Sequence, residues 1–477
     1  MKTKMLLLLA LCSVLHSWSA GARVTMPSFF SDGMVLQQEC MVKIWGYSDN
    51  SEKLTVTTSW DARTYKCKPA ANGSFAIEVH TPQAGGPYNI TINDGDELVL
   101  SDILIGEVWI CVGQSNMEMP VKGFSCQPTE NVLDHLLDCR NDRLRCFMVT
   151  RAAADKECNN LVGEWKSSTI NTVPDFSATA YFFAKRLQAV LDVPVGVIVC
   201  PWGGTSILGW IPLACVERTI SASEIQSIID LADKKKNYPG VLYNGMVAPV
   251  VGYAAKGFIW YQGCANVDHP QLYAKLMKAM IDEYRSRWGK RGRNMSFYAV
   301  ELAPYRYGKN NEQGYERPLW VECVSKMMKG VPATALIPTS DAGHQTNIHP
   351  AKKDIVGDRL AATALKNDYG FTSLEPEPPA IASVDYRGGM AYITTTSALG
   401  PQLAVLSGFE LAGKDGIYYQ AKAYVNHRTS QIEVKAAQVP EPVAVRYNFH
   451  NYVNGATWRN WMGIPALPCR TDNWELK

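Results

Sequence analysis

Four short polar segments, each at or near the end of an apolar run, contain the residues of this 477-residue chain that are best suited to chemistry. Ser115 follows the run EVWICV, Gly204 follows VPVGVIVC and Asn266 follows KGFIWY. Asp341 follows TALIPT, and His349 comes a few residues later, just before a helix-like segment. A serine, a glycine turn, an amide and a histidine thus each lie at or near the end of an apolar run.

These residue types suit nucleophilic attack on an ester. A serine hydroxyl is a weak nucleophile until a base removes its proton, and histidine can do this near neutral pH. We therefore expect Ser115 to be the nucleophile and His349 the base. Attack on a carbonyl creates an oxyanion, which preorganised N–H donors stabilise by about 3 kcal/mol each. The predicted donors are the Ser115 N–H, the Gly204 N–H and the Asn266 side-chain amide.

The apolar runs alternate with helix-like segments from about residue 106 onward. Apolar residues at helical spacing predict helices near residues 178–191, 271–288 and 351–366. Strands that are buried on both faces and alternate with helices indicate a parallel α/β sheet. Ligands gather at the carboxyl ends of the strands in such a sheet, so we expect the four polar segments to meet at one edge.

The segments on both sides of this α/β part have β character. Residues 23–105 contain short strand-like pieces separated by turn signals such as Asn72-Gly73, with a spacing that suits a small sandwich. Short strand-like pieces return near residue 371. We therefore predict an N-terminal β domain at residues 23–105, an α/β domain at 106–370 and a C-terminal β region at 371–477.

The first 22 residues have the pattern of a signal peptide. Lys2 and Lys4 form a basic start, a short apolar core follows, and the segment ends in Ala20-Gly21-Ala22. The apolar core is too short to span a membrane, and no later segment is long and apolar enough to do so. We predict an exported protein, periplasmic or secreted in a bacterium and lysosomal or secreted in a eukaryote.

Composition excludes several classes of partner. The net charge is +2 and no long run of one sign is present, which argues against binding to nucleic acid or to a membrane surface. None of the 13 cysteines forms a CxxC pair, so zinc or redox chemistry is poorly supported, and we predict no cofactor. The oligomeric state is left open by the sequence.

Several segments, in their order along the chain, resemble landmarks of a known family. GQSNM, PWGGTS, WYQGCAN and NIHP resemble the four blocks of the SGNH hydrolases. FFSDGMVLQQ, LYNGMVAP and GIPALPCRTDNW extend a narrower resemblance, to the sialate O-acetylesterase family, over nearly the full length. The resemblance implies an SGNH-hydrolase core, flavodoxin-like with three α/β/α layers, and flanking β-sandwich-like regions. It also implies a Ser115 nucleophile, a His349 base, no metal, and an oxyanion hole from Ser115, Gly204 and Asn266.

Three positions depart from the family pattern. Family members commonly have QGE where this chain has QGC at residues 262–264, and often an acidic residue near Leu208. Many also have Asp two residues before the histidine, where this chain has Asn347. Asparagine lacks the negative charge that stabilises an imidazolium. Asp341 is the predicted acid that orients His349, and a backbone carbonyl is the alternative.

Amide and aromatic side chains beside these blocks are expected to line a sugar-binding pocket. The predicted substrate-binding residues are Gln114, Asn116, Trp202, Gln262 and Tyr243. The predicted function is an exported carbohydrate O-acetylesterase that forms a serine acyl-enzyme, with acetylated sialic acid as the foremost substrate. The alternatives are an acetylesterase of plant polysaccharide, such as acetyl xylan or another hemicellulose, and a catalytically weakened carbohydrate-binding homologue.

Overall fold

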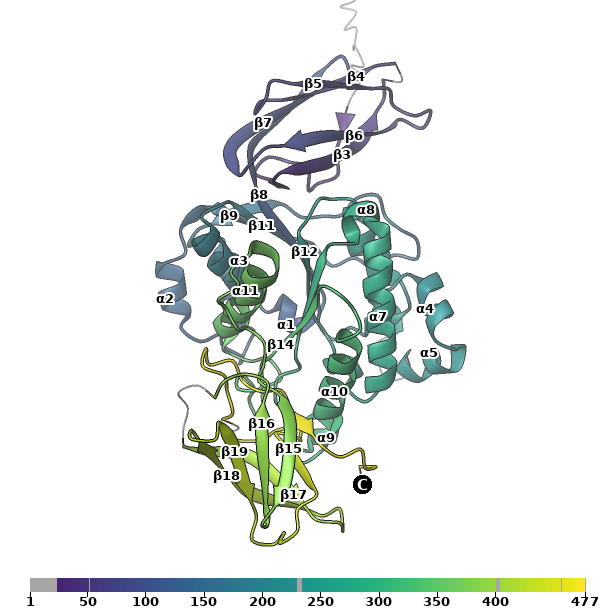
Figure 1. The fold of residues 1–477 in the computed structure, drawn as a ribbon. Helices are drawn as coiled ribbons and strands as arrows, with labels where there is room; N and C mark the ends of the chain where they lie inside the picture. Colours follow the sequence, from purple (N-terminus) through teal and green to yellow (C-terminus); the bar gives the residue numbers. More distant parts are fainter. Residues whose placement is uncertain (1–23, 51, 230–233, 400–403, 456, 477) are drawn as a thin grey trace, which may run out of the picture.

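The computed structural model describes residues 24–50, 52–229, 234–399, 404–455 and 457–476. The predicted signal peptide, residues 1–22, lies outside the described residues. Figure 1 shows a β region, a central α/β part and a second β region arranged in a row. The prediction of an α/β core flanked by β regions is therefore confirmed. No helix in the described part of the chain is long and apolar enough to cross a membrane.

The main path of the central sheet has the strand order β10-β9-β11-β8-β12-β13-β14. In this order the strands are Trp165–Ser168, Asn141–Met148, Val195–Pro201, Glu97–Gly113, Gly257–Tyr261, Ser296–Val300 and Thr334–Ile337. Neighbouring strands are parallel, except that β10 is antiparallel to β9. Gly113 at the end of β8 lies opposite Pro201 of β11 and Tyr261 of β12. The carboxyl ends of these strands thus form one edge.

Helices cover both faces of this sheet. Helices α3 (Ala178–Leu191) and α11 (Lys353–Tyr369) pack against each other over one face, and α7 (Pro270–Arg287) and α10 (Glu316–Met328) pack over the other. The three predicted helices are confirmed, with small differences at their ends. The buried side chains of β8 alternate between the two cores, since Trp109 lies with α3 and α11. This alternation is the period of a strand that is buried on both sides.

Shorter helices connect these elements. They are α1 (Ser115–Glu118), α2 (Val132–Leu137), α4 (Leu213–Thr219), α5 (Ala222–Ile229), α6 (Lys234–Asn237), α8 (Gly289–Gly292) and α9 (Tyr307–Asn310). Helix α1 matters most for the site because it follows directly on the central strand β8.

Strand β8 runs continuously from the N-terminal β region into the central sheet (Figure 1). Its first half pairs with β7 (Gly85–Asn93), which pairs with β4 (Leu54–Thr58) and through it with β5 (Thr64–Cys67). Strand β2 (Val35–Gln37) runs parallel to β8. A separate sheet contains β1 (Val24–Thr25), β3 (Cys40–Ser48) and β6 (Ser74–Thr81). The predicted domain boundary at 105/106 therefore falls inside one strand.

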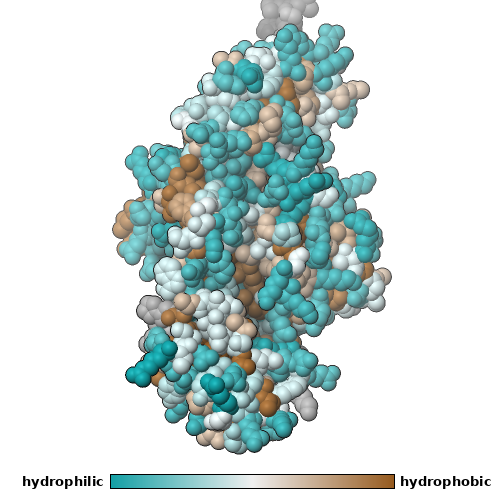
Figure 2. Space-filling model, in the orientation of Figure 1, coloured by the Kyte–Doolittle hydropathy of each residue, from teal (hydrophilic) through white to brown (hydrophobic). Residues whose placement is uncertain are grey.

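The C-terminal β region is a seven-stranded sheet with the order β15-β16-β19-β18-β17-β20-β21. In this order the strands are Ile381–Arg387, Met390–Thr395, Gln431–Lys435, Tyr418–Asn426, Val405–Ala412, Ala444–Tyr447 and Cys469–Arg470. A separate core around Phe409, Tyr447 and Trp458 stabilises it. Figure 2 shows that hydrophilic side chains cover most of the visible face of the molecule, with smaller hydrophobic patches between them.

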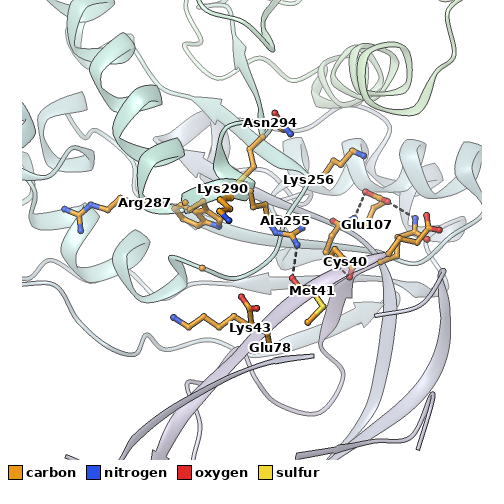
Figure 3. A pocket seen from close by; sticks show the side chains of 18 residues that line it. Cys40, Met41, Lys43, Glu78, Glu107, Ala255, Lys256, Arg287, Lys290 and Asn294 are labelled. Carbon is orange, nitrogen blue, oxygen red and sulfur yellow. Dashed lines mark hydrogen bonds between the residues drawn. The ribbon is translucent and has the colours of Figure 1, made fainter. Parts of the chain in front are cut away.

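A cavity of about 1100 Å³ lies between the N-terminal β region and the central part (Figure 3). Its lining includes Lys43, Lys256 and Lys290, and Glu107 at the base of the parallel part of β8. Glu107 is buried and accepts hydrogen bonds from three side chains, those of Gln37, Gln38 and Tyr369. The cavity adjoins the amino edge of the sheet, about 20 Å along β8 from the edge that carries Ser115.

Candidate active site

Ser115 lies where the central strand ends. Helix α1 begins at Ser115, and Gln114 is its N-cap residue. The turn needs a glycine before it, because a Cβ on Gly113 would lie 2.3 Å from the Tyr261 carbonyl oxygen of the neighbouring strand. The Ser115 side chain is half-buried. Close packing of β8 against β12 thus places the serine hydroxyl at the carboxyl edge of the sheet.

His349 meets Ser115 at this edge. Its Nε2 lies 2.7 Å from the Ser115 Oγ, within hydrogen-bond reach. The segment before α11 holds the ring in place, since the Asn116 amide donates a hydrogen bond to the Ile348 carbonyl oxygen over 3.2 Å. Burial, and secondarily the positive charge of Lys353, lower the pKa of His349 to about 4. The imidazole is therefore neutral at pH 7, which is the form that can accept a proton.

The other ring nitrogen of His349 faces a residue that the sequence analysis missed. Nδ1 forms a hydrogen bond with the Oε1 of Gln127, in the loop that follows α1. The ring of Phe124, from the same loop, packs edge-on against the imidazole with the ring centroids 5.3 Å apart. The predicted orienting groups were an acid or a backbone carbonyl, and no sequence signal marks a glutamine for this position.

Two of the three predicted oxyanion donors are backbone N–H groups, of Ser115 and Gly204. Among the described residues, neither the Ser115 nor the Gly204 N–H has a hydrogen-bond acceptor. The neighbouring Gly203 N–H donates to the Glu118 Oε2 over 2.9 Å, which ties this turn to helix α1. Gly204 has a φ of 64°, a conformation that favours glycine. Free N–H groups beside the nucleophile are what an oxyanion hole requires.

Asn266, the third predicted donor, is buried in a network of polar loops. Its Oδ1 accepts hydrogen bonds from the Ile207 N–H and the Gln262 amide, and its Nδ2 donates to the Ser206 Oγ over 3.1 Å. The amide nitrogen carries a second hydrogen, so one donor is left for a ligand. The oxyanion role of Asn266 stays a prediction.

A buried lysine lies next to the Ser115–His349 pair. Lys353 is fully buried at the start of α11, and its Nζ donates to the Asn116 Oδ1 over 2.5 Å. Burial lowers the pKa of its ammonium group to about 7. Cys264, the departure in the third block, is in the same neighbourhood, and burial raises the pKa of its thiol to about 11. A thiol that stays protonated is a poor nucleophile, which favours a passive role for Cys264.

The structure corrects the predicted role of Asp341. Its carboxylate accepts two hydrogen bonds of 2.7 Å from Arg359 and a further one from Arg459. It therefore joins α11 to the C-terminal segment rather than facing His349. Asn347, two residues before the histidine, caps the His349 backbone N–H with its Oδ1 over 3.0 Å. Asp341 does lie at the predicted strand end, but its carboxylate is hydrogen-bonded to Arg359 and Arg459 there.

Most of the predicted substrate-binding residues are buried and hold the loops together. Gln114 accepts from the Gly263 N–H, and the Gln262 amide donates to the Thr205 carbonyl oxygen. The exposed fractions are 3% for Gln114, 1% for Asn116, 0% for Gln262 and 0% for Tyr243. Tyr243 packs in the core against Tyr284. The structure therefore corrects the assignment of these four residues to direct substrate contact.

Trp202, the fifth predicted residue, is half-buried beside the cationic side chain of Arg151. The guanidinium of Arg151 lies 6.0 Å from the Trp202 ring centroid, and its Nε forms a 2.5 Å ion pair with the Glu118 Oε1. Lys236 donates from Nζ to the Gly203 carbonyl oxygen over 3.2 Å. An aromatic ring, an arginine paired with Glu118 and a lysine thus lie around the Gly203 turn, a feature that the sequence motifs did not reveal.

The side chains that commonly bind metals are His, Cys, Asp and Glu. Across the described ranges, no three His, Cys, Asp or Glu side chains are arranged to hold a metal ion. At the carboxyl edge of the sheet, Ser115 and His349 form a serine–histidine pair with amide donors nearby.

Comparison with known proteins places this geometry in context. Residues 105–366 match the family model described as carbohydrate esterase, sialic acid-specific acetylesterase. A solved carbohydrate acetylesterase from Xanthomonas citri is 31% identical, with a TM-score of 0.84, and the match covers 95% of this chain and all of that one.

Mammalian sialate O-acetylesterases are also similar to the chain. The human enzyme is 26% identical over 397 residues, covering 76% of this chain and 74% of its own length. The mouse enzyme is 24% identical over 456 residues, covering 83% of each.

Proposed function

We propose that this chain, which belongs to the carbohydrate esterase family of sialic acid-specific acetylesterases, hydrolyses O-acetyl esters of sugars. The observation that carries the proposal is the 2.7 Å contact between His349 Nε2 and Ser115 Oγ. Beside it lie the Ser115 and Gly204 N–H groups, for which the described residues provide no acceptor. The core is proposed to be of the SGNH-hydrolase type, in residues 106–370, with β regions at 23–105 and 371–477.

The reaction follows from this geometry. Ser115 Oγ attacks the acetyl carbonyl carbon while its proton passes to His349 Nε2. The tetrahedral oxyanion accepts hydrogen bonds from the Ser115 and Gly204 N–H groups and from Asn266. When the intermediate collapses, the C–O bond to the sugar breaks, and His349 gives its proton to the sugar oxygen. Water, deprotonated by His349, then attacks acetyl-Ser115, and acetate leaves as the serine regains its proton.

The first test is acetate release from 4-nitrophenyl acetate by the mature protein and its Ser115→Ala variant. Loss of the hydroxyl removes the acyl acceptor, so kcat should fall on the order of 10³-fold or more. Ser101→Ala is the matched control, since Ser101 lies on β8 before the central sheet. Equal turnover by the wild-type protein and Ser115→Ala would falsify the serine mechanism.

The proposed substrate is an O-acetylated sialic acid. Sialic acid carries a carboxylate, and the Gly203 turn beside Ser115 has two cations near it, Lys236 and Arg151, the second of which is 54% exposed and paired with Glu118. The alternative substrate is an acetylated plant polysaccharide such as acetyl xylan. We test this alternative because the similar Xanthomonas citri enzyme is described only as a carbohydrate acetylesterase, without a particular sugar.

Acetate release from 9-O-acetyl sialic acid and from acetyl xylan, measured side by side, distinguishes the two substrates. Arg151 also pairs with Glu118, which holds the Gly203 turn, so Arg151→Met should lower both activities. A sialate esterase should lose much more activity on the acidic sugar than on 4-nitrophenyl acetate in this variant. Faster turnover of acetyl xylan, with equal losses of both activities in Arg151→Met, would point to the polysaccharide. Export through cleavage after residue 22 completes the proposal, and an N-terminal sequence of the secreted protein tests it.

A further inference from the structure

The loop after α1 is built around the His349 ring. Phe124 and Gln127 exchange two backbone hydrogen bonds of 3.0 Å each, which close a tight turn at Ser125 and Cys126. Gly123 enters the turn with a φ of 81°, and a Cβ there would lie 2.6 Å from the Gln127 carbonyl oxygen. The turn thus fixes Phe124 and Gln127 as neighbours, and both of their side chains contact the imidazole.

We propose that Gln127 is the residue that positions His349, in the place where a serine hydrolase commonly uses a carboxylate. This inference rests on the proposed function, because it assigns a role within the same site. The Gln127 Oε1 accepts the Nδ1–H of His349, so the lone pair of the ring lies on Nε2, which faces the Ser115 hydroxyl. The amide thereby selects the tautomer that can act as a base.

The nearby acids are engaged elsewhere. Asp341 lies between Arg359 and Arg459, and Glu118 is shared by Arg151 and the Gly203 N–H. Within the part of the chain that the structure describes, no carboxylate hydrogen-bonds to the His349 ring. The loop is also tied to the histidine segment, since the Glu130 N–H donates to the Ala351 carbonyl oxygen over 2.9 Å. Gln127 therefore occupies the position of the third triad member.

A neutral partner has a chemical consequence. A carboxylate stabilises an imidazolium by its charge, whereas an amide oxygen offers only a dipole. The groups that face His349 are the Ser115 hydroxyl, the Phe124 ring and the Gln127 amide, and the charged group acting on it is the Lys353 ammonium. That charge disfavours the imidazolium. Gln127 thus orients the base without making it more basic.

Two substitutions separate orientation from charge. Gln127→Leu keeps the side-chain size but removes the acceptor, and kcat should fall about 10- to 100-fold with KM nearly unchanged. Gln127→Glu keeps the acceptor and adds a charge, which should raise the acid limb of the kcat/KM profile by about one pH unit or more. Gln431→Leu, a half-buried glutamine on β19 in the C-terminal region, is the matched control and should leave both quantities unchanged.

A second measurement, which does not depend on turnover, tests the tautomer of His349 directly. Nitrogen NMR of histidine-labelled protein reports which ring nitrogen carries the proton, and the chain has only 8 histidines to assign. Comparison with a His349→Gln variant identifies the His349 signals. In the wild-type protein Nδ1 should be protonated and Nε2 free, and in Gln127→Leu the two tautomers should mix. Thermal unfolding checks that each variant is folded.

The outcomes separate this inference from the proposed function. The positioning role of Gln127 is overturned if Gln127→Leu turns over within twofold of wild type, or if wild-type His349 carries its proton on Nε2. An acid limb that does not move in Gln127→Glu would also overturn it, since the residue would then be merely structural. If the wild-type protein shows the Nδ1–H tautomer but no Ser115-dependent hydrolysis, the proposed function fails while the assignment of Gln127 as the orienting residue stands.

Discussion

Asp341 and His349 lie near the same edge of the central sheet, eight positions apart in the chain, yet their surroundings are opposite. Asp341 is held by Arg359 and Arg459, so its charge is matched by two cations. His349 has an amide on one nitrogen and the Ser115 hydroxyl on the other, with the Lys353 ammonium nearby. One group is fully compensated in its charged form, and the other is kept in its neutral form.

The difference separates a structural ionisable group from a chemical one. Burial alone would raise the pKa of the Asp341 carboxyl, but the hydrogen bonds and charges of Arg359 and Arg459 outweigh it and hold that pKa below its ordinary value. The Asp341 carboxylate therefore stays charged and immobile. The His349 imidazole keeps a free lone pair aimed at a hydroxyl, so it can exchange a proton during a reaction. An ionisable residue at a strand end is a candidate for chemistry only when its charge and hydrogen-bonding groups are not already compensated by other side chains.

The largest expected effect comes from removing the base. His349→Ala leaves Ser115 without a proton acceptor, and kcat for acetate release should fall on the order of 10³-fold or more. His427→Ala, in the C-terminal β region, is the control and should behave as wild type. Comparable turnover by His349→Ala and wild type would mean that the 2.7 Å contact has no role in catalysis.

A smaller effect, on stability rather than on rate, is expected for Asp341→Asn. The change removes the negative charge that Arg359 and Arg459 share and should lower the free energy of unfolding by about 3 kcal/mol near neutral pH. Because the folded-state pKa of Asp341 is depressed, this contribution is present above the unfolded-state pKa of about 4 and is lost as pH falls through the folded-state value.

Urea unfolding measures this loss, and kcat per folded molecule should stay within about threefold of wild type. Asp385→Asn, an exposed ion-pair partner of Arg387, is the control and should change stability by less than about 1 kcal/mol. A selective fall in kcat for Asp341→Asn, at unchanged stability, would restore Asp341 to the catalytic machinery and abolish the contrast with His349.

The smallest expected effect is a near absence of change between pH 7 and pH 5. The base must be deprotonated, and the pKa of His349 is lowered to about 4, so the acid limb of kcat/KM should lie near that pH. A histidine with the ordinary pKa of about 6.5 would lose about thirtyfold in activity at pH 5. Acetate release across pH 3.5–8 measures the limb. A midpoint near 6.5 would show that burial and Lys353 do not act on His349 as described.

The meeting of Ser115 and His349 could be predicted from sequence because it depends on the chain's strongest regularity. Apolar runs such as EVWICV mark buried strands, and parallel strands end at one edge, which brings Ser115 and the glycine turn together. His349 could be placed in the same way, because it precedes the last helix of the α/β part. The fold class followed from the same alternation of strands and helices.

The partners of these residues could not be predicted, because they depend on side-chain directions rather than on position along the chain. Gln114, Asn116 and Gln262 sit in the expected blocks, but their amides turn inward and join the loops. Tyr243 lies in a motif-like segment and is buried in the core. Gln127 looks like an ordinary loop glutamine in the sequence, because only the turn at Cys126 places it against His349.

The unbroken strand β8, Glu97–Gly113, has a consequence for how this protein can be altered. Its two halves share one alternation of side chains, so inserting or deleting one residue near position 105 would exchange the faces of everything beyond the insertion. Trp109 would then point to the core now filled by Val108. Ser115 would likewise follow a strand whose side chains point to the opposite faces of the sheet. The N-terminal region therefore cannot be exchanged freely between esterases. A graft would keep the side chains on their faces only if the junction gains or loses an even number of residues.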